Sequence, residues 1–178
     1  AETLEGRLLD GQVIEAAFGM SAEEILNQTN AVHIVACGTS YHAGLVARYW
    51  LEEIANIQCT VEVASEYRYR KSVVPTGTLF TTISQSGETA DTLAALQLAR
   101  TKDYCGSLAI CNAPESSLTR ESDLVFLTRA GAEIGVASTK AFTTQLTALF
   151  MLVLLLARKR GLSKEREKEL TALLESLP

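Results

Sequence analysis

The residue types best suited to chemistry lie together in one run of the sequence, Ser84-Gln85-Ser86-Gly87-Glu88-Thr89. This run follows an apolar stretch with strand character and precedes a stretch with helical spacing. Its hydroxyl groups, its amide and the free backbone N–H groups would therefore gather at a helix N-terminus, where partial positive charge favours anions. Such a turn can bind phosphate without a metal ion or a lysine. The run therefore predicts an anion-binding site.

Helix capping is the alternative interpretation of these side chains, because serine and threonine commonly accept hydrogen bonds from the first helical N–H groups. One cap serves one helix, so three hydroxyls and an amide exceed that need, and we favour ligand binding. We expect Gly87 to let the backbone approach the anion closely. A carboxylate beside a phosphate would repel it, so we expect Glu88 to point away and to accept backbone N–H bonds.

A second turn of similar character, Cys37-Gly38-Thr39-Ser40, follows another apolar run. Thr39 and Ser40 could cap the next helix, but their position favours ligand contact. Neither GxGxxG nor GxxxxGK[ST] accompanies the turn, which argues against a dinucleotide and against a nucleoside triphosphate. Two hydroxyl-bearing turns in one small domain indicate a phosphorylated small molecule.

A third candidate segment, Val136-Ala137-Ser138-Thr139-Lys140, leads into a long helical pattern. Ser138 or Thr139 could be the N-cap of that helix, and Lys140 could be either a ligand partner or an ordinary exposed lysine. Glu133 could act as a general base, although a carboxylate on a glycine-bearing loop is more often solvated.

The cysteines and histidines do not predict a nucleophile or a metal centre. Cys37 closes an apolar strand, where a small core residue is the commoner role. The chain has only two histidines, His33 and His42, and no clustered ligand set, so we expect no metal. The four cysteines lack a CxxC spacing, and we expect reduced, partly buried thiols of a cytoplasmic protein rather than disulfides.

Strand and helix patterns alternate along the chain. We expect strands at Val32–Ala36, Cys59–Val63, Thr78–Ile83, Gly106–Cys111 and Leu124–Leu127. We expect helices around Ala43–Ile54, Thr89–Arg100, Ser138–Arg160 and Ser163–Leu177. This alternation predicts an α/β fold, a doubly wound five-stranded parallel sheet with helices on both faces. In the common strand order 2-1-3-4-5, the ligand crevice lies between the first and third strands, at the two hydroxyl-bearing turns.

The flanks of this core are less regular. We expect residues 1–30 to form one or two helices that pack on a core domain at 31–161. Residues 162–178 should form an amphipathic helix that leads to a linker, with Lys164, Glu165, Arg166, Glu167 and Lys168 mostly solvated. The chain opens with Ala1 rather than methionine, inside an expected helix, as a piece of a longer protein would.

Composition limits the function classes. With 178 residues, 47% hydrophobic and 21% charged, the chain is of the globular class. A net charge of −5 argues against a nucleic-acid surface, and the basic run Arg68-Tyr69-Arg70-Lys71 is a weak patch. The apolar segment 146–157 is too short and too polar at its edge to span a bilayer, so it predicts a buried helix and no membrane partner. No export signal is visible.

Three strings together resemble the sugar isomerase (SIS) domain family. They are Cys37-Gly38-Thr39-Ser40-Tyr41, Ser84-Gln85-Ser86-Gly87-Glu88-Thr89-Ala90-Asp91-Thr92 and Glu133-Ile134-Gly135-Val136-Ala137-Ser138-Thr139-Lys140-Ala141-Phe142-Thr143. More narrowly, they resemble the first of the two SIS domains in the glutamine:fructose-6-phosphate amidotransferase family. The resemblance runs from about residue 6 to the end of the chain.

The resemblance implies a flavodoxin-like five-stranded sheet, a site for fructose 6-phosphate or glucosamine 6-phosphate, and no cofactor. The implied phosphate-binding residues are Ser40, Ser84, Gln85, Ser86 and Thr89. The implied sugar-binding residues are Thr39, Val136 and Ser138. The resemblance also implies a homodimer.

Much of what the family enzyme uses has no counterpart in this chain. No N-terminal cysteine for glutamine hydrolysis is present, and the family's carboxylate base and Schiff-base lysine belong to the second SIS domain and its tail. The resemblance therefore implies no catalytic residue here, and implies a second SIS domain and a glutaminase domain as partners. Two alternatives stay open: a non-catalytic SIS sensor of a phosphosugar, and a stand-alone phosphosugar isomerase with Glu133 as its base.

Overall fold

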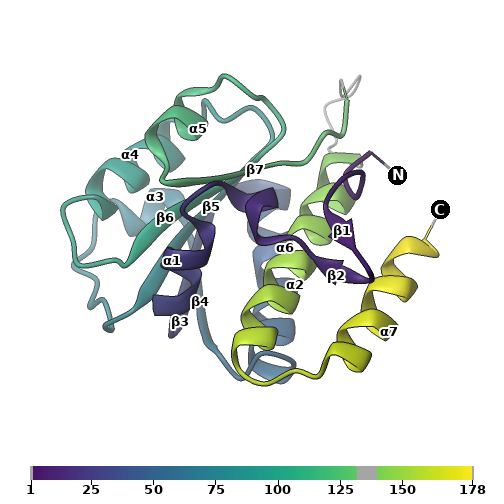
Figure 1. Cartoon of the computed structure of the whole chain (residues 1–178). Coiled ribbons are helices and arrows are strands. Elements are labelled where there is room, and N and C mark those ends of the chain that lie inside the picture. The colour runs from purple at the N-terminus through teal and green to yellow at the C-terminus, as the bar shows by residue number, and fades with distance from the viewer. Residues whose placement is uncertain (1, 132–139, 178) are drawn as a thin grey trace.

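The computed structural model describes residues 2–131 and 140–177, and its central feature is a five-stranded parallel sheet (Figure 1). Its strands are β3 (Ala31–Ala36), β4 (Gln58–Val63), β5 (Thr78–Ser84), β6 (Gly106–Cys111) and β7 (Leu124–Leu127). They lie in the order β4-β3-β5-β6-β7, and every neighbouring pair is parallel. This is the 2-1-3-4-5 order, so the predicted doubly wound α/β fold is confirmed.

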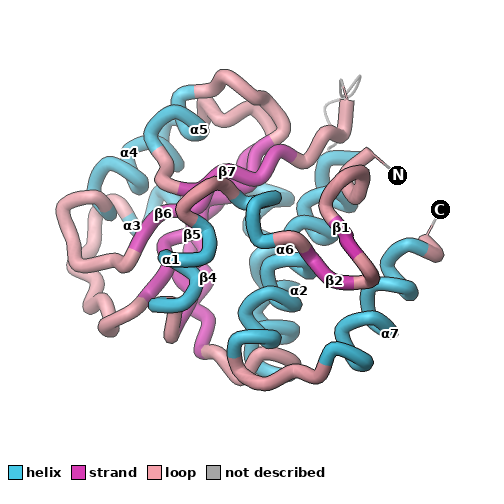
Figure 2. The backbone as a smooth tube through the Cα atoms, in the orientation of Figure 1, coloured by secondary structure: helices cyan, strands magenta, loops and turns pink. Residues whose placement is uncertain are grey.

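Helices cover both faces of the sheet, as Figure 2 shows, because both faces of its central strands are apolar. Side chains alternate between the faces: Ile34 and Val35 of β3 belong to two different hydrophobic clusters. One face is covered by α1 (Ala22–Gln28), α2 (Gly38–Glu53) and α6 (Lys140–Lys159), the other by α3 (Ala64–Tyr67), α4 (Ala90–Ala99) and α5 (Ser117–Glu121). The continuous apolar strands are typical of a sheet buried on both sides.

The N-terminal segment was expected to form one or two helices, and in addition to helices it contains strands that were not expected. It contains a two-stranded antiparallel ribbon, β1 (Leu8–Leu9) and β2 (Gln12–Val13), then a 3₁₀ helix, η1 (Glu15–Phe18), and α1. Ribbon strands of two residues are too short for a recognisable alternation. The segment is fixed to the core by polar contacts, since the Arg7 guanidinium donates to the carbonyl of Leu127.

The C-terminal helix α7 (Lys164–Glu175) is present as expected, but one of its charged residues was placed wrongly. Glu167 is fully buried rather than solvated. Its carboxylate accepts hydrogen bonds from the Arg158 guanidinium at 2.7 and 2.9 Å and from the Val13 backbone N–H at 3.0 Å. A buried carboxylate needs such partners, and here they join α7, α6 and β2.

The long apolar helix α6 is a core helix of this fold. The expectation that the apolar segment is too short to span a bilayer was wrong for the whole helix, because its length and composition alone would allow it to cross one. Most of its apolar residues, among them Leu149, Leu152 and Leu156, are buried against the rest of the protein. All four cysteines are unpaired, in agreement with the expected free thiols.

Candidate functional site

The two hydroxyl-bearing turns meet at one edge of the sheet. Ala36, the last residue of β3, pairs with Ile83 of the neighbouring parallel strand β5. The segments that follow therefore leave the sheet side by side, at the point where the winding direction reverses. They enclose a cavity of about 280 Å³, near the lower end of the roughly 300–1,000 Å³ typical of small-molecule sites. Its lining residues are Cys37, Gly38, Thr39, Ser40, Ile83, Ser84, Gln85, Ser86, Thr89 and Thr92.

All the predicted phosphate-binding residues and Thr39 line this cavity together. Val136, Ser138 and Glu133 lie outside the described residues, so the implied sugar contacts and the alternative base stay predictions. Thr92 was not predicted. It is buried and lies one helical turn after Thr89, a spacing that puts both side chains on one face of α4 and could have identified it.

Two helix N-termini point their unpaired backbone N–H groups at the cavity. α2 begins at Gly38 and α4 at Ala90, after the N-cap residues Cys37 and Thr89. Neither N-cap side chain accepts a capping hydrogen bond, so the first N–H groups of both helices have no side-chain cap there. Capping by Thr89, the alternative for that hydroxyl, is contradicted. The arrangement places two sources of partial positive charge beside one cavity.

The serine hydroxyls of the second turn shape the turn and keep a donor. Ser84 Oγ accepts the backbone N–H of Gly87 at 2.9 Å, and Ser86 Oγ accepts that of Glu88 at 3.2 Å. In both bonds the hydroxyl is the acceptor, so its own proton remains to be donated to a ligand oxygen. Ser84 is buried and Ser86 is exposed, which places one at the floor and the other at the rim of the cavity.

Glycine is required at position 87 for a reason that the sequence did not reveal. Its φ is +69°, which favours glycine. A Cβ atom there would lie 2.9 Å from Cys111 Sγ and would clash with the Ser116 side chain. The lack of a side chain at Gly87 thus lets Ser116 and Cys111 pack closely against the loop. The close approach of an anion to the backbone of Gly87 stays a prediction.

Glu88 accepts a backbone N–H bond, as expected of a carboxylate beside an anion site. Its Oε1 atom accepts the backbone N–H of Ser117 at 2.6 Å, at the start of α5. This hydrogen bond lowers the pKa of the Glu88 carboxyl below its ordinary value, with a further contribution from the positive charge of Arg120. A second acid near the cavity, Asp91 in the first turn of α4, lies 2.7 Å from the Arg68 guanidinium. Both negative charges therefore have partners of their own.

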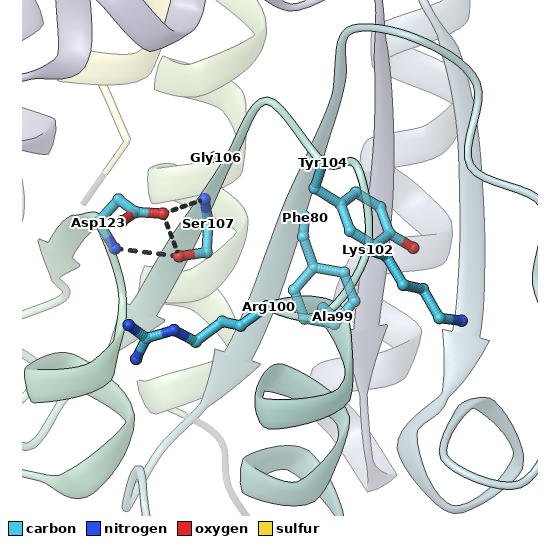
Figure 3. Close-up of a pocket in the computed structure, with 8 residues that line it drawn as sticks. All are labelled: Phe80, Ala99, Arg100, Lys102, Tyr104, Gly106, Ser107 and Asp123. Carbon is cyan, nitrogen blue, oxygen red and sulfur yellow. Dashed lines mark hydrogen bonds between the residues drawn. The ribbon is translucent and has the colours of Figure 1, made fainter.

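A second cavity, of about 190 Å³, lies at the amino ends of β5 and β6, at the edge of the sheet away from the turns (Figure 3). Arg100, Lys102 and Tyr104 are among its lining residues. The acidic residue among them, Asp123, is hydrogen-bonded within the fold. Its Oδ2 atom accepts hydrogen bonds from the backbone N–H and the hydroxyl of Ser107 at 2.8 and 2.6 Å. Within the described parts of the chain, no group of His, Cys, Asp and Glu is arranged to hold a metal ion.

Comparison with known proteins identifies close relatives. The chain is 61% identical to a glutamine–fructose-6-phosphate aminotransferase (isomerizing) of Idiomarina loihiensis, over 99% of this chain and 29% of that protein. It is 59% identical to the enzyme of the same name from Vibrio vulnificus, over the same shares of the two chains. The chain thus spans less than a third of the length of these curated relatives.

A solved structure agrees with this similarity. The C-terminal domain of glucosamine-fructose-6-phosphate aminotransferase from Francisella tularensis superposes with a TM-score of 0.95 and 51% identity, covering 98% of this chain and 49% of the other. Residues 25–155 match the family model of the SIS domain, a segment that contains β3 to β7 and both hydroxyl-bearing turns. The chain therefore belongs to the SIS domain family.

Proposed function

We propose that this chain binds fructose 6-phosphate or glucosamine 6-phosphate as the first SIS domain of an isomerizing glutamine–fructose-6-phosphate aminotransferase. In the whole protein, nitrogen from glutamine would convert fructose 6-phosphate to glucosamine 6-phosphate. The 57–61% identity to several aminotransferases of that name supports the assignment. Since the chain spans only 29% of their length, a glutaminase domain and a second SIS domain are its proposed partners.

The observation that carries the proposal is the cavity between the two turns. It combines hydroxyl donors, two helix N-termini and a glycine-bearing loop, the set of groups that binds phosphate through neutral donors. We assign the phosphate group to Ser40, Ser84, Gln85, Ser86 and Thr89. We assign the sugar to Thr39, Val136 and Ser138, the last two by family resemblance alone.

The proposed role of this chain is binding and orientation. The chain would bind the phosphate group, which is remote from the reacting carbons C1 and C2. That binding would orient C1 and C2 next to a base supplied by the second SIS domain. We therefore propose no catalytic residue within the chain. Unpaired thiols support a cytoplasmic location, and the family resemblance is the ground for proposing a homodimer.

Titration calorimetry on the purified chain tests the proposal. Fructose 6-phosphate should bind, fructose should not, and inorganic phosphate should compete, because the phosphate group carries the recognition. Equal affinity for fructose and its phosphate would contradict it. A parallel assay with fructose 6-phosphate and ammonia should yield no glucosamine 6-phosphate, whereas isomerisation by the chain alone would favour a stand-alone isomerase.

A further inference from the structure

We propose that Glu88 is a positioning residue, whose carboxylate holds the loop from Ser84 to Thr89 in its phosphate-binding shape by tying it to the start of α5. This inference rests on the proposed function, because it concerns the same loop. The Glu88 carboxylate would then support the binding of an anion, although its negative charge by itself repels one.

The loop is held on its far side by contacts with one short segment. The Gly87 carbonyl accepts the backbone N–H of Leu118 at 3.2 Å, and the Glu88 carboxylate accepts that of Ser117 at 2.6 Å. The missing side chain of Gly87 lets the Ser116 side chain and Cys111 Sγ approach the loop closely. Two adjacent loop residues are thus bonded to two adjacent residues of α5.

Among these contacts, the hydrogen bond between Glu88 and Ser117 should contribute most to holding the loop against α5. A carboxylate that accepts an N–H bond makes a charge-assisted hydrogen bond, about twice as strong as a neutral one. The same residue also donates its backbone N–H to Ser86 Oγ at 3.2 Å. The position of Glu88 therefore sets the position of a hydroxyl that we assign to the phosphate.

The side chain of Glu88 is exposed, whereas its loop neighbours Ser84 and Gly87 are buried. An exposed side chain contributes little to the core, so its loss should alter the loop rather than unfold the protein. Electrostatic repulsion alone predicts the opposite effect on affinity. If Glu88 only repelled phosphate, removing its charge would strengthen binding.

Three variants of the full 178-residue chain separate these possibilities. Glu88→Ala removes both the charge and the acceptor. Glu88→Gln removes the charge and keeps an oxygen that can accept the Ser117 N–H. Glu115→Ala removes an exposed acid of the neighbouring loop and is the matched control for charge. Calorimetry with fructose 6-phosphate and with inorganic phosphate gives affinity, and amide hydrogen exchange of Ser117 and Leu118 in the ligand-free chain reports the tie directly.

We expect Glu88→Ala to weaken the binding of both ligands about tenfold and to speed the exchange of the Ser117 amide, at an almost unchanged melting temperature. Glu88→Gln should restore wild-type affinity within about threefold, and Glu115→Ala should bind as the wild type does. Unchanged or stronger binding by Glu88→Ala would overturn the positioning role and leave the proposed function intact. Failure of the wild-type chain to bind either ligand would contradict the proposed function itself, and the inference with it.

Discussion

Ala36 of β3 lies opposite Ile83 of β5 in the parallel register of the sheet. β3 ends at Ala36 and is followed by the first turn of α2, which carries Thr39 and Ser40, whereas β5 ends at Ser84 and is followed by the loop that carries Gln85 and Ser86. Two segments more than forty residues apart in the sequence therefore form one cavity. The sheet register, rather than either loop alone, creates the proposed phosphate site.

Ser86 should contribute to binding and hardly at all to folding. Ser86→Ala removes a hydroxyl at the exposed rim of the cavity, and we expect it to weaken fructose 6-phosphate binding by roughly 1.5–3 kcal/mol, the range for a hydrogen bond to a charged group. Ser163→Ala is the matched control, because Ser163 Oγ accepts the Arg166 N–H as the N-cap of α7. That variant should lose about 1 kcal/mol of stability and no affinity. Titration calorimetry and thermal melting measure both, and an unchanged affinity for Ser86→Ala would remove it from the site.

Gly87→Ala should damage the loop more than an ordinary substitution at positive φ does. Gly6 has a nearly identical φ of +71°, with open space around the position of a Cβ atom. Gly6→Ala should therefore cost only the conformational strain, about 1–2 kcal/mol. Gly87→Ala adds overpacking against Ser116 and Cys111, a further 1–3 kcal/mol or so, and should also lower affinity for the phosphosugar. Chemical denaturation compares the two, and equal losses would contradict the close contact.

His33 should make the stability depend on pH. Burial lowers the pKa of His33 below its ordinary value of 6.5 in spite of Glu62, whose Oε1 lies 2.7 Å from Nε2. Tyr104 hydrogen-bonds to Nδ1, and the cations Arg70 and Lys102 lower the pKa further. Below pH 6.5 the unfolded chain therefore binds a proton that the folded chain does not. Stability should be complete above that pH and should fall as the pH drops towards the folded pKa, by at most about 1.4 kcal/mol per pH unit.

Melts between pH 5 and pH 7.5 measure this slope. Glu62 does not interfere in that window: burial alone would raise its pKa, but Arg70 and His33 hold it below 4.5. His33→Asn should flatten the slope, while His42→Gln, at an exposed histidine, should keep it. A slope that is the same in His33→Asn and the wild type would show that another group is responsible.

Glu167 should be one of the costliest single positions in α7. Its carboxylate is fully buried and bonded to the Arg158 guanidinium, so Glu167→Ala leaves a cation without its partner. We expect a loss of about 3–5 kcal/mol, typical of breaking a buried ion pair. Glu165→Ala, two residues before Glu167 and at an exposed position, should change stability by less than about 0.5 kcal/mol. Urea denaturation measures both, and similar small losses would mean that the buried pair is not holding α7 to the core.

The sheet could be predicted from the sequence because its strands are continuous apolar runs. Gly106–Cys111 and Leu124–Leu127 were placed at their observed bounds, and the other strands within one residue at each end. The strand order followed from the commonest doubly wound topology, and with it the cavity between the two turns. Hydroxyl-bearing residues beside a glycine were a sufficient signal for most of the polar residues that line this cavity.

What the sequence could not reveal are contacts between distant residues. Glu88 and Ser117 are 29 positions apart, and no local pattern connects them. Gly87 requires glycine because of Ser116 and Cys111, which also depends on tertiary packing. Glu167 sits in a run of charged residues that resembles a solvated helix face, and only the fold brings Arg158 to it. Propensity and periodicity reveal none of these three contacts.

The most direct test of the proposed phosphate site is an amide-resolved NMR titration of the ¹⁵N-labelled chain with fructose 6-phosphate, with fructose as the control. We predict that the largest chemical-shift changes fall on the backbone N–H groups of Thr39, Ser40, Ser86 and Thr89, and that fructose leaves these signals unchanged. Shifts that cluster instead around Arg100 and Lys102, at the second cavity, would contradict it.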